Sequence, residues 1–428
     1  MTTTHYFEKP TAGSWTESYP DLGTAPVDYT DSIDPAHYEK ERTAIFRRTW
    51  LNVGRIEQIP RKGSYFTREL AVVSSSFIIV NGGDGKIHAF YNICRHRGNK
   101  LVWKDFPGEE TNGNCRQFTC KYHAWRYDLD GGLNFVQQED EFFDLEKSRY
   151  GLKSVRCEVW EGFIFINLDD NAAPLRDYLG TLAHGIEGYP FHEMTEVYRY
   201  RAEIGSNWKL FIDAFAEFYH APVLHNKQYT KDEAAKIMAH GYEAIHYEVA
   251  DPHGMVSSGG GQSPPKRLDI VKPMDQVLRS GLFGPWDKPD VAGLDHLPAG
   301  INPGRFKYWG TDSFHFFPNF MLLFWEPGWF MTYHFWPTAV NRHIFEGTMY
   351  FAPPRNARER LAQELAAATF KEFGLQDANT LEATQTMLES RAITEFPLND
   401  QEILLRALHK SAHDYVKEYE NGSIPTQH

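Results

Sequence analysis

The pattern of apolar and polar positions changes twice along the chain. In residues 35–48, Tyr38, Ala44 and Ile45 recur at roughly helical spacing and predict a short amphipathic helix. Between about residues 51 and 168 the apolar stretches are short and are separated by turns such as NGGDGK and DLDGG, which predicts a meander of β-strands. Beyond residue 168, helical patterns such as NWKLFIDAFAEFYH and RNARERLAQELAAATFKEFG are mixed with strand-like runs such as FEGTMYFAPP. The predicted fold class is therefore α+β, with an all-β region before a larger mixed region.

The length of 428 residues favours two domains. We place the limits at 1–44 for an N-terminal arm and helix packing on the mixed domain, 45–168 for the β domain, and 169–428 for the mixed domain. Within the last, DPHGMVSSGGGQSPPKR at 251–267 is rich in Gly, Ser and Pro, and it predicts a surface loop or lid.

Composition narrows the functional class. The formal net charge of −13 argues against nucleic acid or an anionic membrane as the main partner, because both favour basic surfaces. The sequence has no run of eighteen apolar residues and no signal-peptide pattern at its N-terminus, so we expect neither a membrane span nor export. Four cysteines are too few for a disulfide framework and fit a reducing cytoplasm. Clustered cysteines in such a compartment more often bind metal than each other.

Two short motifs each combine one cysteine with one histidine. Cys94 and His96 lie two positions apart, and Cys120 and His123 lie three apart, each pair where a strand turns over. Two such loops can enclose one inorganic group from two sides. A structural Cys2His2 zinc site is the alternative, but zinc fingers pair Cys with Cys and His with His, whereas this interleaving suits a two-iron cluster.

The remaining two cysteines are expected to be buried small apolar residues. Cys115 competes with Cys120 for the second thiolate, but the residue three positions after Cys115 is Phe118, which cannot bind metal. Choosing Cys120 leaves a long loop after His96, which contains the polar insertion DFPGEETNG. Cys157 belongs to neither motif.

A second candidate metal site lies in NWKLFIDAFAEFYHAPVLH. On a continuous helix Asp213, Glu217 and His220 would share one face, and burying three ionisable groups there without a purpose is costly. Pro222 cannot continue that helix, which would let His225 turn back toward His220. Two imidazoles and one carboxylate on one face of a metal leave positions open for dioxygen. The alternative makes His220 a core histidine and His225 a helix-end residue.

Together these motifs resemble the catalytic α subunit of Rieske non-haem iron oxygenases, the aromatic ring-hydroxylating family. The similarity covers nearly the whole chain, from RRTWLNVGRIEQIPRKGSYFTREL through CRHRG, CKYHAWRYDLDG and the E-x-Y-H-x-x-x-x-H motif to the C-terminal helices. It implies a Rieske [2Fe-2S] domain followed by a catalytic domain in which helices surround an antiparallel sheet, as in helix-grip or START-like folds. It also implies which residues bind the cofactors: Cys94, His96, Cys120 and His123 for the cluster, and His220, His225 and Asp377 for the mononuclear iron.

The resemblance assigns two further carboxylates. Asp377 stands where the family has an aspartate near the start of a late helix, although it could instead cap that helix. Glu217 stands where many members have aspartate, and we expect it to carry electrons from the cluster of a neighbouring subunit to the iron. Where the common family pattern reads Glu-Asn, this chain has Asp213 and Ala214. A catalytic role for Asp213 is therefore the least supported of the residue roles that the resemblance implies.

The resemblance implies an oxygenase that uses O2 and electrons from a separate reductase. The chain has no Gly-x-Gly-x-x-Gly motif placed after a strand, so a ferredoxin or flavin reductase using NAD(P)H is the expected partner. Within 94–126 the basic residues outnumber the acidic ones, which suggests docking of an acidic electron donor. The basic residues are Arg95, Arg97, Lys100, Lys104, Arg116, Lys121 and Arg126. A homotrimer, with or without a small β subunit, is the expected assembly.

The substrate is expected to be apolar and aromatic, as in aromatic hydrocarbon catabolism. Apolar residues of the iron motif are candidates for the substrate pocket: Phe211, Phe215, Phe218, Val223 and Leu224. Cis-dihydroxylation by a dioxygenase and hydroxylation by a monooxygenase use the same site, and N- or O-demethylation is the alternative. A zinc-stabilised binding protein is a more remote alternative.

Overall fold

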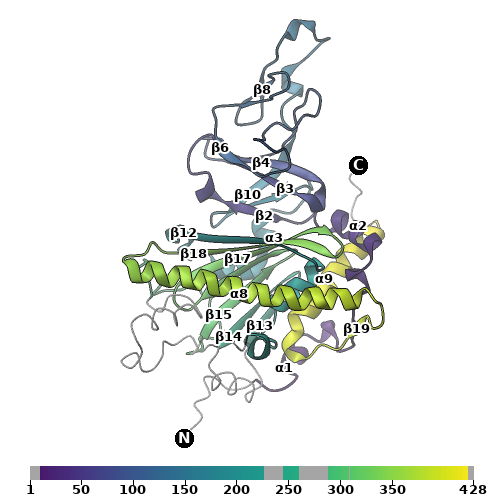
Figure 1. The fold of residues 1–428 in the computed structure, drawn as a ribbon, viewed down its shortest axis with the longest axis vertical. Coiled ribbons are helices and arrows are strands. Elements are labelled where there is room, and N and C mark those ends of the chain that lie inside the picture. The colour runs from purple at the N-terminus through teal and green to yellow at the C-terminus, as the bar shows by residue number, and fades with distance from the viewer. Residues whose placement is uncertain (1–9, 226–243, 260–287, 308, 423–428) are drawn as a thin grey trace. The chain divides into compact units, whose positions relative to one another are not determined.

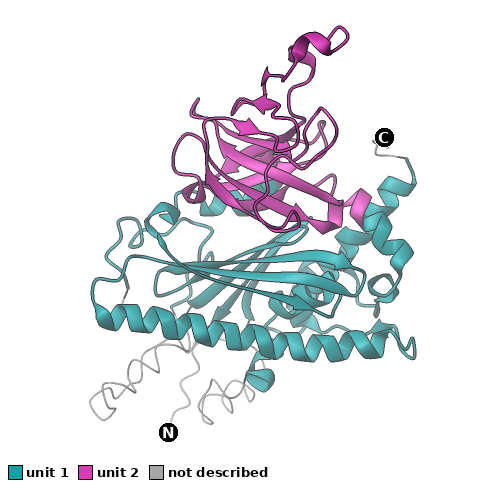
Figure 2. Ribbon diagram, turned by 45° about the horizontal axis from the view of Figure 1, so that its top comes forward, with its two compact units in different colours: residues 1–41, 179–426 teal, residues 42–178, 427–428 magenta. Residues whose placement is uncertain are grey.

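The computed structural model describes residues 10–225, 244–259, 288–307 and 309–422. The chain divides into two compact units, residues 1–41 with 179–426 and residues 42–178 with 427–428 (Figure 2). These boundaries fall three and ten residues from the sequence-based limits of 44/45 and 168/169, which remain a proposal. None of the helices in the described ranges is both long and apolar enough to cross a membrane.

The smaller unit is built on a seven-stranded antiparallel sheet with the strand order β2-β11-β10-β5-β4-β3-β6. Its strands are β2 (Leu51–Arg55), β3 (Ser64–Leu70), β4 (Ser75–Asn81), β5 (Ile87–Tyr91), β6 (Asn112–Asn114), β10 (Ser154–Trp160) and β11 (Phe163–Asn167). The NGGDGK turn joins β4 to β5 as predicted. A second, three-stranded sheet contains β7 (Phe118–Thr119), β8 (Arg126–Tyr127) and β9 (Leu133–Phe135), with the DLDGG turn between β8 and β9.

The larger unit contains a second seven-stranded antiparallel sheet with the order β12-β18-β17-β16-β15-β14-β13. Its strands are β12 (Glu196–Ile204), β13 (Ala244–Ala250), β14 (His253–Gly259), β15 (Trp309–Phe316), β16 (Phe320–Trp325), β17 (Trp329–Ala339) and β18 (Arg342–Phe351). Strands β15 to β17 are buried along nearly their whole length, so both faces of the sheet are covered there, whereas the edge strand β12 exposes one face. The expected loop at 251–267 is wrong for residues 253–259, which form β14, and residues 260–267 lie outside the described residues.

Helices of the larger unit lie against this sheet, and Figure 1 shows α8 (Ala357–Leu388) running across it. The others are α1 (Ser14–Ser18), α4 (Trp208–Phe215), α5 (Ala221–Leu224) and α9 (Ile403–Glu420), and α3 (Leu175–Ile186) spans the boundary between the units. The predicted helix at 35–48 is α2 (Pro35–Ala44), and a short sheet pairs β1 (Val27–Asp28) with β19 (Glu395–Phe396).

Helix α4 is buried around most of its circumference, and its sequence is apolar except for the buried Lys209 and Asp213. Asn207 caps its N-terminus, because its side chain accepts a hydrogen bond from the Lys209 N–H at 2.9 Å. The helix ends at Phe215, and the Ala216 N–H bonds back to the carbonyls of Ile212 and Asp213. The predicted continuous helix through Glu217 and His220 is therefore wrong.

Candidate functional site

The first cysteine–histidine loop is a tight turn closed by its own backbone. The Cys94 N–H donates to the Asn99 carbonyl at 2.8 Å, and the Gly98 N–H donates back to the Cys94 carbonyl at 3.0 Å. Gly98 has φ of 72°, a left-handed conformation that glycine adopts without strain. The backbone thus holds the Cys94 and His96 side chains on one short loop.

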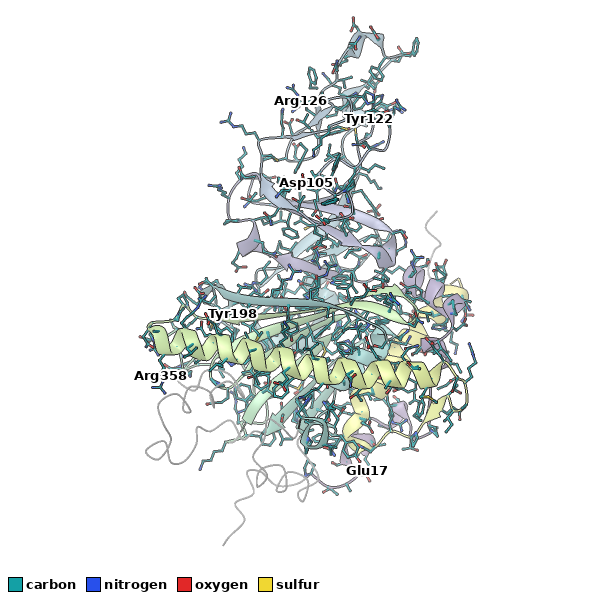
Figure 3. All side chains as sticks on the ribbon, in the orientation of Figure 1. Glu17, Asp105, Tyr122, Arg126, Tyr198 and Arg358 are labelled. Carbon is teal, nitrogen blue, oxygen red and sulfur yellow. The ribbon has the colours of Figure 1, made fainter. Side chains whose placement is uncertain are left out.

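The second loop repeats this geometry with a different sequence. The Cys120 N–H donates to the Trp125 carbonyl at 2.9 Å, and the Ala124 N–H donates to the Cys120 carbonyl at 3.0 Å. Ala124 takes the left-handed conformation at φ 59°, where the first loop has Gly98. Tyr122 of this loop and Arg126 at its end are labelled in Figure 3. Two loops of the same backbone design therefore each present one thiol and one imidazole.

The four side chains of these loops come together. Cys94 and Cys120 are both buried free thiols, and the Tyr127 hydroxyl lies 3.3 Å from the Cys94 sulfur. The ring centroids of His96 and His123 are 4.6 Å apart. His96 also stacks on Trp125 at 4.9 Å. The imidazoles of the two loops thus lie against each other, and the thiols of Cys94 and Cys120 also interact with each other.

Two features of this group fit a bound cluster. Nδ1 of His96 is buried and has no hydrogen-bond partner within the described ranges, as expected for a nitrogen that binds metal. Burial raises the pKa of the Cys94 thiol, although its contact with Tyr127 acts the other way. Because a bound cation favours the thiolate, a metal would reverse this effect of burial.

The other two cysteines lie outside the two loops, and Cys115 packs against the hydrophobic cluster that contains Cys94 and Cys120. Both are partly buried, so the expectation that they are buried holds in part. Burial raises the pKa of Cys115 to about 11 and that of Cys157, on β10, to about 12. Both thiols are therefore poor thiolate donors.

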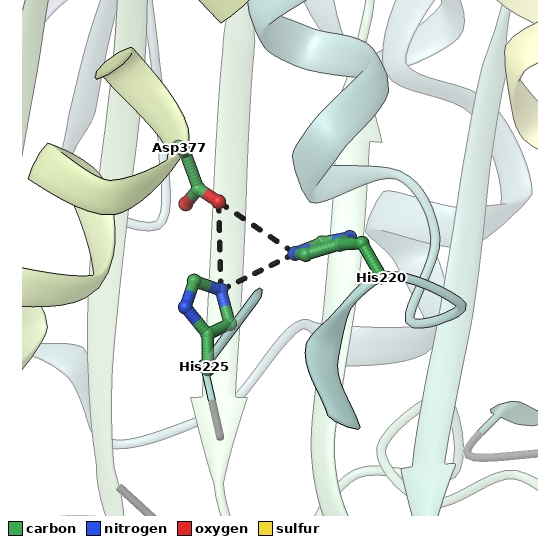
Figure 4. A group of neighbouring side chains, drawn as sticks. All are labelled: His220, His225 and Asp377. Atoms are coloured by element: carbon green, nitrogen blue, oxygen red, sulfur yellow. Dashed lines mark hydrogen bonds and ion pairs between the residues drawn. The ribbon is translucent and has the colours of Figure 1, made fainter. Parts of the chain in front are cut away.

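The second candidate site brings together His220, His225 and Asp377 (Figure 4). Nε2 of His220 lies 3.2 Å from Nε2 of His225. Oδ1 of Asp377 lies 3.6 Å from the first of these nitrogens and 3.4 Å from the second. Three donor atoms that face one point at this spacing form one face of a divalent metal site.

The short helix α5 sets the spacing of the two histidines. His220 is the residue before α5 and His225 the residue after it, so four residues separate the two rings. Pro222 lies in the first turn of α5, where its missing N–H costs nothing. Pro222 therefore begins a helix rather than ending one, which corrects the sequence-based account of how His225 reaches the site.

Asp377 reaches the site from the middle of α8, more than a hundred residues further along the chain. The helix is capped at Asn356, so the prediction that Asp377 lies near a helix start is wrong, and so is the alternative that it caps one. Gly374 lies one turn before Asp377, and a Cβ there would come within 3.3 Å of the Phe345 ring. Glycine thus lets α8 lie close to the sheet, which places Asp377 beside the histidines.

The other nitrogen of each imidazole is held by a second residue. Nδ1 of His220 bonds to Glu217, whose other oxygen accepts the His220 backbone N–H at 3.1 Å. Nδ1 of His225 donates to the Gln376 side-chain carbonyl at 2.7 Å. These contacts aim both Nε2 atoms at Asp377. Sequence reasoning missed Gln376, and its position next to Asp377 is the only sequence signal for it.

The burial and the shifted pKa values of these residues favour a bound cation. Asp377 is 1% exposed, and its Oδ1 has no hydrogen-bond partner in the part of the chain that is described. Burial raises the pKa of Asp377 to about 7, and burial lowers the pKa of His225 to about 4. Two imidazoles beside a buried carboxylate that accepts no hydrogen bond on Oδ1 are the donor set of a non-haem iron site.

Comparison with known families agrees with this geometry. The family model for the Rieske [2Fe-2S] domain matches residues 49–154, and the model for the ring-hydroxylating α subunit, catalytic domain, matches residues 191–418. The chain belongs to the ring-hydroxylating α-subunit family. This confirms the predicted family and α+β fold, and it confirms a Rieske cluster and a mononuclear iron as the cofactors. It also favours iron over the structural zinc alternative.

Curated relatives of this α subunit match over less than half of the chain. The glycine betaine monooxygenase oxygenase subunit of Pseudomonas aeruginosa (strain UCBPP-PA14) is 33% identical over 192 residues, 45% of this chain and 43% of that protein. The carnitine monooxygenase oxygenase subunit of Escherichia coli (strain K12) is 33% identical over 194 residues, 45% of this chain and 50% of that protein. The matched stretch thus spans half or less of each relative.

Solved structures match the fold over most of the chain. The quaternary ammonium Rieske monooxygenase CntA with L-carnitine gives a TM-score of 0.68 at 19% identity, over 96% of this chain and 99% of that one. Naphthalene 1,2-dioxygenase with indole bound in the active site gives 0.68 at 24% identity, over 93% of this chain and 95% of that one. At these identities the likeness shows the fold alone.

A pocket of about 250 Å³ lies beside the candidate iron site of this α subunit. Four carboxylates line it, those of Asp213, Glu217, Asp377 and Glu402, and no Lys or Arg of the described residues does. Of the residues proposed for a substrate pocket, Leu224 lines it. The lining beside His220 therefore combines these four carboxylates with mostly apolar side chains, among them Leu210, Leu381 and Phe396.

The other proposed pocket residues lie away from this cavity. Phe211 is fully buried and packs on Phe345 at 4.8 Å, and Phe215 packs on Tyr333 at 4.7 Å. Phe218 packs against a separate core cluster, and Val223 is 60% exposed. The two phenylalanines of α4 thus belong to the core between this helix and the sheet.

A second group of possible metal ligands in the larger unit already contacts a lysine ammonium group. Asp31, His37 and Glu41 lie close together, but Nζ of the fully buried Lys209 forms an ion pair with Glu41 and lies 3.5 Å from Asp31. The Trp208 indole also donates to Glu41 at 3.0 Å. An ammonium group occupies the place of a cation, so this group is structural.

Proposed function

We propose that this chain is the oxygenase component of a Rieske monooxygenase that hydroxylates a methyl group of a small methylated ammonium compound, leading to demethylation. The observation that carries the proposal is that His220, His225 and Asp377 converge in a chain that also has two matching Cys/His loops. When bound, the iron supplies a centre at which O2 is reduced by electrons arriving singly through the cluster. The side chains around the iron determine which residues bind it and which hold those ligands by hydrogen bonds.

The chain's own residues prepare the iron site. Glu217 and Gln376 hold the Nδ1 atoms of the two imidazoles and thereby present both Nε2 atoms to the metal. Asp377 supplies the negative charge, and its burial keeps water from competing for it. The arrangement favours Fe(II) with positions left for O2.

Charge and relatives together support a cationic substrate. The carboxylate-lined pocket beside the iron site favours a cation. The named relatives are monooxygenases of glycine betaine and carnitine, which are methylated ammonium compounds. We therefore place the demethylation alternative ahead of the aromatic hydroxylation expected from the sequence.

Hydroxylation of an aromatic ring is the second candidate. Tyr333 is buried and Tyr200 is partly buried. Burial raises the pKa of both hydroxyls, and the charge of Asp377 adds to the rise, which supports placing both side chains within electrostatic range of this carboxylate. Aromatic faces near the iron could stack on an aromatic substrate as well as hold a methylammonium group.

Electron delivery would use the surface of the smaller unit. Arg95, Arg97, Lys104 and Lys121 are exposed near the Cys/His loops, and Asp105 in the polar insertion is labelled in Figure 3. We propose that this basic surface receives an acidic ferredoxin or flavin reductase that draws on NAD(P)H. All four cysteines are free thiols, which supports a cytoplasmic location.

Assembly into a homotrimer, with or without a β subunit, remains part of the proposal. A ring lets one subunit's cluster lie near the next subunit's iron, and Glu217 is placed to join them because it already holds His220. The solved structure of a quaternary ammonium Rieske monooxygenase is described as giving insight into inter-subunit electron transfer in that protein.

The test is turnover by the metal-loaded protein with a competent reductase and NADH. Glycine betaine and carnitine should be demethylated with release of formaldehyde, in step with NADH and O2 consumption, whereas naphthalene should give no diol. Diol formation without formaldehyde would support the second candidate instead. Failure of both, with full iron and acid-labile sulfide content, would overturn the proposed substrate classes.

A further inference from the structure

His409 of α9 and Asp213 of α4 form a buried pair near the iron site. Nε2 of His409 lies 3.1 Å from Oδ2 of Asp213, and the Tyr29 hydroxyl donates to the same oxygen at 3.0 Å. The rings of Tyr29 and His409 pack with centroids 4.3 Å apart. All three side chains are less than a tenth exposed. Neither the cluster motif nor the iron motif contains His409.

Each member of the pair has one polar atom without a partner. Both contacts to Asp213 use Oδ2, and its buried Oδ1 has no hydrogen bond within the described residues. Nδ1 of His409 is likewise buried and unpartnered among them. Buried polar atoms are nearly always satisfied, so each of these atoms is expected to meet an ordered water.

The two residues line different cavities. His409 lines a pocket of about 1010 Å³ between the N-terminal arm and α9, together with His37, Asp31 and His413. Asp213 lines the pocket of about 250 Å³ that also contains Glu217, His220 and Asp377. The bond between His409 and Asp213 therefore joins a polar cavity to the iron site.

The surroundings favour a charged His409. Burial opposes protonation, but the charge of Asp213 and its hydrogen bond outweigh this, and the pKa of His409 is raised. Asp31 adds to the rise from the N-terminal arm, whereas Lys209 of α4 opposes it. Glu402, before α9, faces the Asp213 side, where burial and the charges of Glu217 and Asp213 raise its own pKa.

We propose that His409 and Asp213 form the route by which protons enter the iron site from the polar cavity. The proposal rests on the proposed function, because inserting one oxygen atom into a C–H bond consumes protons. The reaction consumes R–H, O2, two electrons and two protons, and it gives R–OH and water. The O–O and C–H bonds break, and the electrons come from the NAD(P)H-linked reductase. The charged His409 releases the proton on Nε2 to Oδ2 of Asp213, and the resulting carboxyl group turns and passes that proton to water beside Glu217. The His409 ring then turns over and regains a proton from water of the polar cavity.

His409→Gln tests the route, because glutamine can still donate to Asp213 but cannot relay a proton. The matched control is His413→Gln, an exposed histidine one turn further along α9 that lines the same cavity. With reduced, metal-loaded protein, substrate and O2, proton uptake is followed with a pH-indicator dye. Uptake should slow roughly a hundredfold in His409→Gln and show a larger solvent isotope effect, while the control matches the parent. Parental uptake in His409→Gln would overturn the route.

A second measurement does not depend on turnover. In metal-free protein with labelled histidine, NMR should show His409 protonated on both nitrogens at pH 7, with its Nδ1 proton exchanging with water. Asp213→Asn should remove that charge. A neutral His409, or a ring proton protected from exchange, would overturn the proposal. If the parent protein oxidises no methylated ammonium compound, the proposed function fails, and the NMR result still decides whether the pair is connected to water.

Discussion

Replacing Asp377 with asparagine should stabilise the metal-free protein. The Asp377 carboxyl is 1% exposed, its Oδ1 is unpartnered in the described part of the chain, and its pKa rises from 3.8 to about 7. Since one pKa unit corresponds to about 1.4 kcal/mol, holding this group ionised costs the folded state up to about 4 kcal/mol. Asparagine keeps the shape, removes the charge, and its amide can donate to the nearby imidazoles.

The sign of the pH dependence follows from the raised pKa. An acid that titrates at a higher pH when folded destabilises the fold fully above about pH 7 and not at all below its ordinary value of 3.8. The advantage of Asp377→Asn should therefore be largest at pH 8 and shrink toward pH 4. Thermal unfolding of chelated protein should show a gain of roughly 4–7 °C at pH 8.

Adding Fe(II) should reverse the order of the melting temperatures of the parent and Asp377→Asn. Fe(II) that binds only the folded parent raises its melting temperature, whereas Asp377→Asn should bind iron weakly and gain little. Glu364→Gln is the matched control, since it replaces an exposed carboxylate on the same helix that pairs with the exposed Arg360, and it should leave both melting temperatures nearly unchanged. If Asp377→Asn is less stable than the parent in the metal-free state as well, the carboxylate has a structural role and the reasoning from burial is refuted.

Three further predictions concern the cluster, the bridge and a buried ion pair. Cys120→Ser should abolish the visible cluster spectrum and Cys115→Ser should retain it; a bleached Cys115→Ser protein would reverse the ligand assignment. Glu217→Gln should keep both metals but slow cluster reoxidation in rapid mixing with substrate and O2, and a parental rate would exclude the bridge. Lys209→Met leaves Glu41 buried without its ammonium partner and should lower the free energy of unfolding in denaturant by about 3–5 kcal/mol. Adding Glu41→Gln should recover most of this loss. If nothing is recovered, the loss is not electrostatic.

The motifs whose ligands are close in sequence were predictable. Cys94 with His96, and Cys120 with His123, lie on single turns, so the spacing alone fixes which side chains share a loop. His220 and His225 are separated by one short helix. The sequence could not show that α4 ends at Phe215, because FAEFYH continues a helical pattern and its end is set by packing in the larger unit.

Residues that reach the site from distant elements left little trace in the sequence. Asp377 came from the family resemblance alone, and its place in the middle of α8 was hidden because a helix of 32 residues contains many carboxylates. His409 lies on the last helix with no motif around it. Gln376 is one glutamine among several on α8. Such residues acquire a role only when the fold brings their helices beside the histidines.

Two buried aspartates of the larger unit show how this fold distinguishes a structural carboxylate from a metal ligand. Asp312 is fully buried, and its oxygens accept hydrogen bonds from Ser257 at 2.6 Å, from the Asn302 N–H at 2.6 Å and from the Trp309 indole at 2.8 Å. Burial still raises its pKa, but only to about 6, because these donors oppose the effect. Asp377 is as deeply buried, yet its Oδ1 meets two imidazole nitrogens and no donor in the described residues. A buried carboxylate with a structural role is expected to accept hydrogen bonds, as Asp312 does. The unpartnered Oδ1 of Asp377 therefore indicates that the stabilising partner of Asp377 is a cation that the imidazoles bind as well.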